Sequence, residues 1–329
     1  MTKYMIKRLL QSLLTIFLIV SVVFLLMRLM PTDYFFTEDE LMKLTDQQRH
    51  DRLQAAGLLD SPFVQLARFW KNLITKGDLG ISRRIQTGKP VTTVIGSKFG
   101  ISMQLGLISL LISLIIGVTL GILQARFKDG LFDGIGTAYT IFVNAVPHLV
   151  SYSLIMIFGA KVLGLPSQYS ARKVWKFMLL GQQVKFNYST LLPILCLGMG
   201  STASYMLWMR RYMVDELNKE YIRLAKLKGL STTQVMFRHV MKNAFLPLAQ
   251  YLPYSVLLTV GGSLLVERFF SIPGLGPLLT DSISRYDTNV VQAIVMLYAT
   301  LGIIGLFLGD VLMTLIDPRI KLTGKGGVR

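Results

Sequence analysis

The chain has 329 residues, of which 52% are hydrophobic and 16% are charged, and its formal net charge is +17. A soluble domain carries about 25% charged residues, so this composition excludes an ordinary soluble protein and indicates a membrane protein. The basic residues are spread over segments between apolar runs, where they meet anionic lipid headgroups. We therefore expect membrane lipid, and not nucleic acid, to surround this chain.

Six apolar windows of at least 19 residues contain no Asp, Glu, Lys or Arg. About 20 apolar residues are needed to cross the hydrocarbon of a bilayer, and helices satisfy their own backbone groups there. The sequence therefore predicts an all-α membrane protein with six transmembrane helices. The windows are Leu9–Met27, Phe99–Ala125, Gly134–Ala160, Phe186–Met209, Asn243–Val266 and Thr288–Gly309.

The first window is longer than the apolar region of a signal peptide, and no small-residue cleavage site follows it. Residues 1–30 are therefore predicted to hold an uncleaved first span. Residues 31–98 form an extracytoplasmic segment with a charged, helix-prone start and the amphipathic stretch "SPFVQLARFWKNLI". The other five spans lie in a core domain, residues 99–316, and residues 317–329 form a cytoplasmic tail.

The distribution of Lys and Arg predicts the orientation, because cytoplasmic loops carry the excess of basic residues. With the N-terminus inside, the cytoplasmic pieces hold 17 basic residues and the short outer loops hold 6. Both termini are therefore predicted to be cytoplasmic. The outer stretch 164–190 has no predicted role.

The outer connection "VERFFSIPGLGPLLTDSISRYD" joins the last two spans, and its prolines and glycines exclude one continuous helix. Glu267 and Arg268 stand at its membrane edge. Charged groups at such positions form an interfacial ion pair or face a translocation path as an outer gate. Both interpretations stay open from the sequence.

Recognisable catalytic and metal-binding patterns are missing from the sequence. The three histidines, His50, His148 and His239, are far apart, and no phosphate-binding loop is present. We expect no enzyme activity, no cofactor and no metal, so any ATP hydrolysis belongs to another polypeptide. Asp310 is the only acid deep in an apolar run, and this scarcity of buried charge argues against a proton-coupled secondary transporter.

The segment 210–247 contains "EYIRLAKLKGL", a basic helical stretch between two apolar runs. Its helix is predicted to continue the fourth span, to place residues 221, 224, 225 and 228 on one face, and to end at Gly229, which allows a left-handed turn. Ser231 or Thr232 then caps a second helix. Such a knob either docks into another protein or lies on the lipid surface.

The loop "EYIRLAKLKGLSTTQVMFRHVMKNAFLP" resembles the "EAA" loop of ABC importer permeases, in the oligopeptide, dipeptide and nickel branch. The stretches "GLLDSPFVQ", "GDLGIS" and "PVTTVI" resemble the first of the two paired permeases. "NAVPHLV", "GGSLLVERFFSIPGLGPLL" and "DVLMTLIDPRI" extend the likeness. Arg223, Leu224 and Ala225 stand where the pattern has Glu-Ala-Ala, so only Ala225 and Gly229 fit the broad consensus.

The resemblance implies a type I ABC importer permease in the plasma or inner membrane of a prokaryote. Its implied partners are a second permease subunit, two cytoplasmic ABC ATPase subunits, an extracytoplasmic peptide-binding protein and a peptide substrate. Leu224 and Ala225 would insert into an ATPase groove and Gly229 would set the corner. The implied coupling residues are Glu220, Tyr221, Arg223, Leu224, Ala225, Lys228 and Gly229.

Three alternatives remain at this point. Within the family, the chain could import nickel or another small solute. Outside the family, it could be a secondary transporter, or a membrane anchor that transports nothing. The helical knob argues against the secondary transporter, which needs no ATPase contact. The Gly-rich spans indicate either a bundle that slides or ordinary tight packing.

Overall fold

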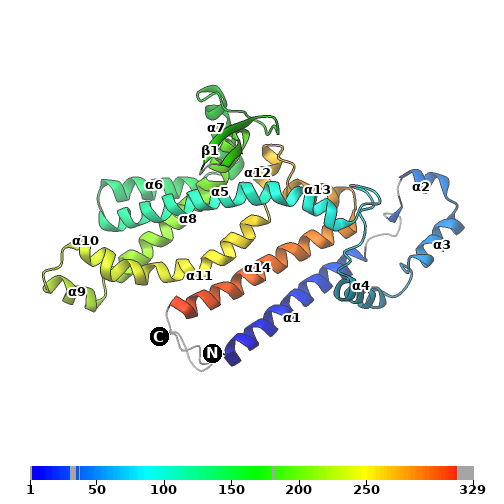
Figure 1. The fold of residues 1–329 in the computed structure, drawn as a ribbon, viewed down its shortest axis with the longest axis horizontal. Helices are drawn as coiled ribbons and strands as arrows, with labels where there is room; N and C mark the ends of the chain where they lie inside the picture. The colour runs from blue at the N-terminus through cyan, green and yellow to red at the C-terminus, as the bar shows by residue number, and fades with distance from the viewer. Residues whose placement is uncertain (1, 30–34, 37, 180–181, 317–329) are drawn as a thin grey trace.

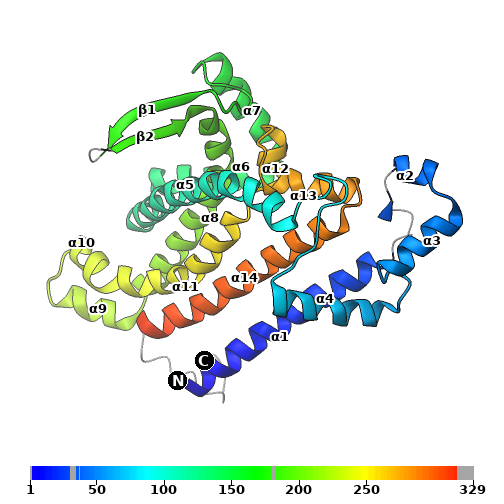
Figure 2. The ribbon, with the colours of Figure 1, turned by 45° about the vertical axis from the view of Figure 1, so that its right-hand side comes forward.

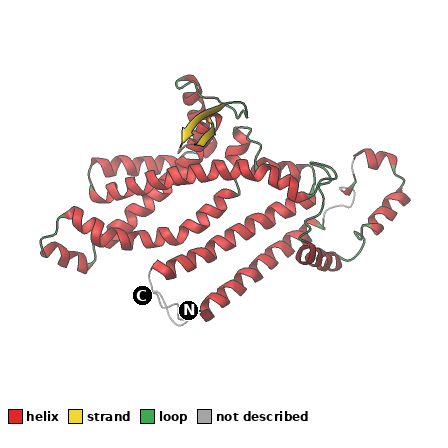
Figure 3. Ribbon diagram, viewed as in Figure 1, coloured by secondary structure: helices red, strands yellow, loops and turns green. Residues whose placement is uncertain are grey.

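The computed structural model describes residues 2–29, 35–36, 38–179 and 182–316, and the predicted tail 317–329 lies outside them. The described chain is mostly helical, and one hairpin of two strands joins the helices (Figure 3). The helices are α1 (Thr2–Met27), α2 (Glu38–Lys43), α3 (Asp46–Ala55), α4 (Pro62–Lys76), α5 (Val91–Arg126), α6 (Leu131–Ala145), α7 (His148–Lys161), α8 (Leu191–Leu217), α9 (Glu220–Leu227), α10 (Thr232–Val235), α11 (Met241–Val260), α12 (Leu264–Phe269), α13 (Leu275–Ser284) and α14 (Thr288–Ile316).

Within the described residues, five helical stretches are long and apolar enough to cross a membrane. They confirm five of the six predicted spans. The stretches are Met5–Met27, Val91–Arg126, Tyr188–Leu217, Thr232–Phe269 and Thr288–Ile316.

The remaining predicted span, residues 134–160, is the third in chain order and is not one helix. It comprises α6 and α7, which are bent by 112° at the break between them. Pro147 causes this break, because a proline lacks the backbone N–H and clashes with the preceding turn. Val146 accordingly takes the extended conformation (φ −85°, ψ 129°) that a residue before proline prefers.

The long helices pack side by side: α1 lies along α14, α14 along α11, and α5 along α8 (Figure 1). The short helices α9 and α10 lie at one end of this bundle, and α2 and α3 lie at the other (Figure 2). The loop that resembles a coupling loop is therefore far from the helices between α1 and α4.

Small residues let these helices approach closely. A Cβ atom at Gly117 of α5 would fall 2.8 Å from the Thr202 carbonyl oxygen of α8, and one at Gly305 of α14 would fall 2.6 Å from the Tyr254 Cα of α11. These two glycines thus serve tight packing, which is how helices associate in lipid.

The segment between α1 and α5 is tied to the spans by aromatic contacts. On α4, the Phe69 ring centroid lies 5.2 Å from that of Phe24 on α1. The neighbouring Trp70 ring lies 4.9 Å from Phe17, and its Nε1–H donates to Ser21 Oγ at 3.0 Å. The α4 helix therefore lies against the C-terminal half of α1.

Asp287, at the start of α14, holds the turn before α5. Its Oδ2 accepts from the Ser82 hydroxyl at 2.6 Å and from three successive backbone N–H groups, those of residues 83, 84 and 85, at 3.0–3.1 Å. Asp287 is 1% exposed. A concave row of backbone N–H groups is a favourable site for a carboxylate, so this residue anchors the segment to the last span.

The stretch 164–190 forms a β-hairpin that the sequence did not predict. Strand β1 (Val174–Leu179) pairs antiparallel with β2 (Gln182–Asn187), and Val174 is opposite Asn187. Trp175 stacks on Tyr188 at 5.0 Å between ring centroids. The hairpin follows α7 and projects from the side of the bundle (Figure 2).

Candidate functional site

The loop between α8 and α11 forms a compact helical knob. The α8 helix ends at Leu217, so the predicted continuous helix is broken at residues 218–219 before α9 begins at Glu220. At the end of α9, Gly229 has φ +82°. Its N–H donates to Lys226 O at 3.0 Å, while the Leu230 N–H lies 3.4 Å from Ala225 O. This is a Schellman motif, and it confirms the predicted glycine stop.

The next helix begins with a capping box, which confirms the predicted start at Ser231. The Ser231 hydroxyl accepts from the Gln234 N–H at 3.3 Å, and the Gln234 side chain accepts from the Ser231 N–H at 3.0 Å. A π-helical turn over residues 236–240 then leads into α11. Both ends of the corner between α9 and α10 therefore have satisfied backbone groups.

A buried carboxylate fastens α9 to both neighbouring spans. Glu216, at the end of α8, is 6% exposed. It accepts from the Tyr221 hydroxyl, from Asn243 Nδ2 at 3.0 Å and from Lys219 Nζ at 2.6 Å. Burial, together with the bond to Glu216, raises the pKa of Tyr221 to about 12, so the phenol stays protonated and keeps donating. The network joins α8, α9 and α11.

One face of α9 is buried within the chain. Ile222 is 0% exposed and Ala225 is 7% exposed, and both pack in a core with Met213, Val235 and Val240. The expectation that Ala225 inserts into a partner's groove is therefore wrong, because its side chain faces its own chain. The small Ala225 instead lets α9 lie close to the core.

The opposite face of α9 is exposed and mixed in character. Leu224 is 55% exposed and Leu227 is 84% exposed, and Tyr221 is 40% exposed despite its bond to Glu216. Charged side chains surround these leucines. The exposed charged residues are Glu220, Arg223, Lys226 and Lys228. An apolar pair inside a basic rim has the composition of a protein interface.

A partly open cavity of about 1030 Å³, here termed the central cavity, lies between the helices of the bundle. Helix α8 contributes a polar and aromatic stripe to it, and the break between α6 and α7 contributes Asn144 and His148. Arg8 and Asp310 are its charged lining residues, and they pair with each other at 3.3 Å. The cavity wall is therefore close to neutral. The stripe on α8 consists of Ser201, Ser204, Tyr205, Trp208 and Tyr212.

Glu267 and Arg268 do not form the ion pair that the sequence allowed, and the place of Arg268 at an outer gate stays a prediction. Glu267 is 0% exposed, so it faces no path. Its carboxylate accepts from the backbone N–H of Gly276 at 2.9 Å and of Ser263 at 3.2 Å. Arg268 instead pairs with Asp281 at 2.7 Å. Glu267 is thus an internal anchor for the α12–α13 turn.

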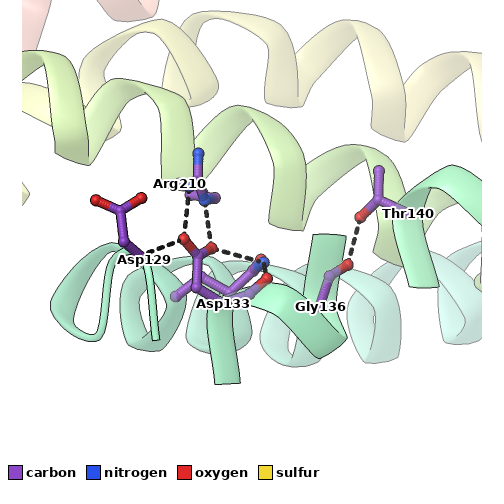
Figure 4. Close-up of polar contacts among 6 residues, drawn as sticks. Asp129, Asp133, Gly136, Thr140 and Arg210 are labelled. Carbon is purple, nitrogen blue, oxygen red and sulfur yellow. Dashed lines mark hydrogen bonds and ion pairs between the residues drawn. The ribbon is translucent and has the colours of Figure 1, made fainter. Parts of the chain in front are cut away.

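A second buried ion pair joins α6 to α8 near the knob (Figure 4). Arg210 donates from Nε and Nη2 to the two carboxylate oxygens of Asp133, at 2.5 and 2.6 Å. Asp133 also accepts from the Asp129 N–H at 3.0 Å and from Gln124 Nε2 at 3.3 Å. Such a bidentate pair fixes both distance and orientation, so α6 and α8 are held together two turns before α9.

Replacing Asp133 with asparagine is expected to lower the free energy of unfolding by about 1–3 kcal/mol, because the partly buried Arg210 guanidinium loses its charged hydrogen-bond partner. Thermal unfolding in detergent would measure this loss. Asp129→Asn is the matched control: it is exposed, contributes only its backbone N–H to the pair, and its φ of +62° is one that asparagine tolerates. Equal stability of the two variants would contradict the prediction.

Sequence reasoning missed Glu216, Leu227 and the cavity lining. The stripe on α8 recurs every three or four residues in a charge-free span, so helical spacing of polar side chains was a usable signal. Leu227 and Glu216 gave no comparable signal, because their exposure and burial depend on how α9 folds back. Among the described residues, no three His, Cys, Asp or Glu side chains gather in a way that would hold a metal ion.

Residues 117–322 match the model of the family described as binding-protein-dependent transport system inner membrane component. The dipeptide transport system permease protein DppB of Lactococcus lactis subsp. cremoris (strain MG1363) is 32% identical over 98% of this chain and 100% of its own length. DppB of Bacillus subtilis (strain 168) is 30% identical over 99% of this chain and 100% of its own. The oligopeptide transport system permease protein AppB of Bacillus subtilis (strain 168) is 29% identical over 98% of this chain and 100% of its own length.

The family match covers the spans from the last turns of α5 onward, and with them the α9 knob and most of the helices around the cavity. The match to the two DppB proteins extends through α1 and the segment between α1 and α5. This chain therefore belongs to the family of binding-protein-dependent transport system inner membrane components.

Proposed function

We propose that this chain is a transmembrane permease subunit of an ATP-driven peptide importer. The observation that carries the proposal is the combination of a rigidly fastened helix α9, which exposes Leu224 and Leu227, with a central cavity of about 1030 Å³. A helix that is fixed to α8 and α11 moves with them, so a partner that displaces α9 changes the shape of the cavity.

Peptides are the proposed substrates. Three relatives that match over their full length are named dipeptide and oligopeptide permeases. A neutral wall of hydroxyl, amide and aromatic groups suits a substrate with varied side chains, since it neither attracts nor repels one charge. A nickel ion would need converging His, Cys or carboxylate ligands, and no three such side chains gather among the described residues. This supports a peptide substrate over nickel.

The proposed partners follow from the same reasoning. A second permease subunit completes the path, and this chain is proposed as the first of the pair. Two cytoplasmic ATPase subunits hydrolyse ATP, and one receives the α9 face. An extracytoplasmic peptide-binding protein delivers substrate at the opposite end. In this orientation both termini and the knob are cytoplasmic, and alternating access arises as ATP biases two packed states.

Affinity purification of the tagged chain in mild detergent tests the proposal. Mass spectrometry should find ATPases with nucleotide-binding motifs and a second permease with the chain. Reconstituted with a peptide-binding protein, the complex should take up labelled dipeptide or oligopeptide only when ATP is present. A chain that purifies alone and still moves solute across liposomes would overturn the proposal and favour a secondary transporter.

A further inference from the structure

Helix α4 contacts α1 inside the part of α1 that spans the membrane. Its partners there are Phe17, Ser21 and Phe24, and all three lie within the apolar stretch Met5–Met27. Phe24 lies three residues and Phe17 ten residues before the end of that stretch, which correspond to about 5 and 15 Å along a helix. Both ribbon views show α4 beside the C-terminal half of α1 (Figures 1 and 2). With 15 residues, α4 is too short to cross a bilayer, but part of it lies at bilayer depth.

One stripe of α4 is apolar, and the described part of the chain covers only its middle. The spacing i, i+4, i+7, i+11 places four residues on this face of the helix. Trp70 packs on Phe17 of α1, whereas Phe63 is 72% exposed and Ile74 is 77% exposed. A strip of apolar surface is therefore left uncovered on both sides of the tryptophan. The stripe consists of Phe63, Ala67, Trp70 and Ile74.

This stripe continues an exposed apolar surface of α1. Phe17, which Trp70 contacts, is itself 45% exposed. The residues seven, four and three positions before Phe17 share its face of the helix. They are Leu10, Leu13 and Leu14, and each is more than half exposed. In a helix that crosses a membrane, such a surface contacts acyl chains, so the stripe on α4 adjoins a surface that faces lipid.

The remaining residues of α4 have the composition of a helix that lies on a membrane. The helix contains three basic residues and no acidic residue. Arg68 is paired with Asp60 at 2.7 Å, which leaves the exposed Lys71 and Lys76 available to lipid phosphate. An amphipathic helix with aromatic and aliphatic residues on one face and basic residues on the other lies in the interface plane. A protein interface would instead combine apolar with polar groups, and the stripe contains no charged side chain.

We propose that α4 is an interfacial helix, immersed in the leaflet at the C-terminal end of α1, and that phospholipid acyl chains cover Phe63 and Ile74. Phe69 and Trp70 fasten the helix to α1 from the other side. The leaflet would thus hold the segment between α1 and α5 against the bundle. This role is additional to the proposed function and does not depend on it.

Spin labelling of the full-length chain in phospholipid nanodiscs tests this placement. Phe63→Cys and Ile74→Cys carry the label in turn, in a Cys196→Ala background that removes the single native cysteine. A label in lipid collides with dissolved oxygen and is shielded from a water-soluble nickel chelate. Thr75→Cys is the matched control, because Thr75 is exposed and follows Ile74 at about 100° around the helix. The ratio of oxygen to nickel accessibility should be roughly tenfold higher at positions 63 and 74 than at position 75.

The other outcomes would overturn the proposal in different ways. Equal nickel accessibility at all three positions would place α4 in water. Shielding of positions 63 and 74 from both oxygen and nickel would show that protein covers the stripe. The same measurement on the chain purified with its partner subunits should still find oxygen contact, and its loss there would make a partner subunit the occupant. Because no transport is measured, failure of the proposed function would leave these results unchanged.

Discussion

Replacing Leu227 with aspartate is expected to lower ATP-driven uptake at least tenfold while the chain stays folded. The Leu227 side chain is 84% exposed, so the change removes little packing within the chain. In the proposed assembly this residue and Leu224 enter an apolar groove of the ATPase. An aspartate there would bury an unpaired charge, and leaving a buried charge without a partner costs about 3 kcal/mol or more, which exceeds a hundredfold in affinity.

The measurement is dipeptide uptake and ATP hydrolysis by the reconstituted complex, made with wild-type or variant chain. Uptake should fall, and hydrolysis should lose its stimulation by the loaded binding protein. Leu131→Asp is the matched control, since Leu131 is 83% exposed at the start of α6 and lies outside the knob. If both variants transport normally, α9 is not the coupling contact. If both fail equally, the effect is not specific to α9.

Replacing Glu267 with alanine is expected to have the largest effect on stability. Its carboxylate is fully buried and accepts from the N–H groups of Gly276 and Ser263, and it also bonds to the Ser102 hydroxyl of α5. Removing it leaves the two N–H groups unpaired at about 1–3 kcal/mol each, so the loss should reach about 2–6 kcal/mol. Thermal unfolding in detergent would measure it, with a lower yield of folded chain.

Arg268→Ala provides the comparison, because Arg268 is the adjacent charged residue and its pair with Asp281 is exposed. Exposed pairs contribute about 1 kcal/mol or less, so this variant should unfold near the wild-type temperature. Glu267→Gln should reduce uptake only in proportion to the loss of folded chain. A stable Glu267→Gln protein with a selective transport defect would instead return Glu267 to the translocation path.

The spans were predictable because one physical rule governs them: a helix that crosses lipid must be apolar over about 20 residues. The glycine corner after α9 and the serine cap of α10 were predictable as well, because each depends on a local backbone geometry that few residues satisfy. The break between α6 and α7 was less accessible. Hydropathy alone does not separate a straight span from one that Pro147 turns by 112°.

The roles of single side chains were harder to predict, because they depend on contacts between distant parts of the chain. Helical spacing placed Ala225 and Leu224 on one face, but the fold of α9 onto α8 and α11 buries the first and exposes the second. Adjacent charges suggested a pair between Glu267 and Arg268. The turn over residues 270–274 instead brings the backbone of Gly276 to Glu267.

The bond between Asp287 and the turn at residues 82–85 joins positions that are 202–205 residues apart. It cannot form during synthesis until almost nine-tenths of the chain has left the ribosome. The segment between α1 and α5, which is made early, therefore waits through the synthesis of every later span before its anchor arrives. Contacts of such long sequence separation form slowly, so this early part of the protein is among the last to reach its final structure.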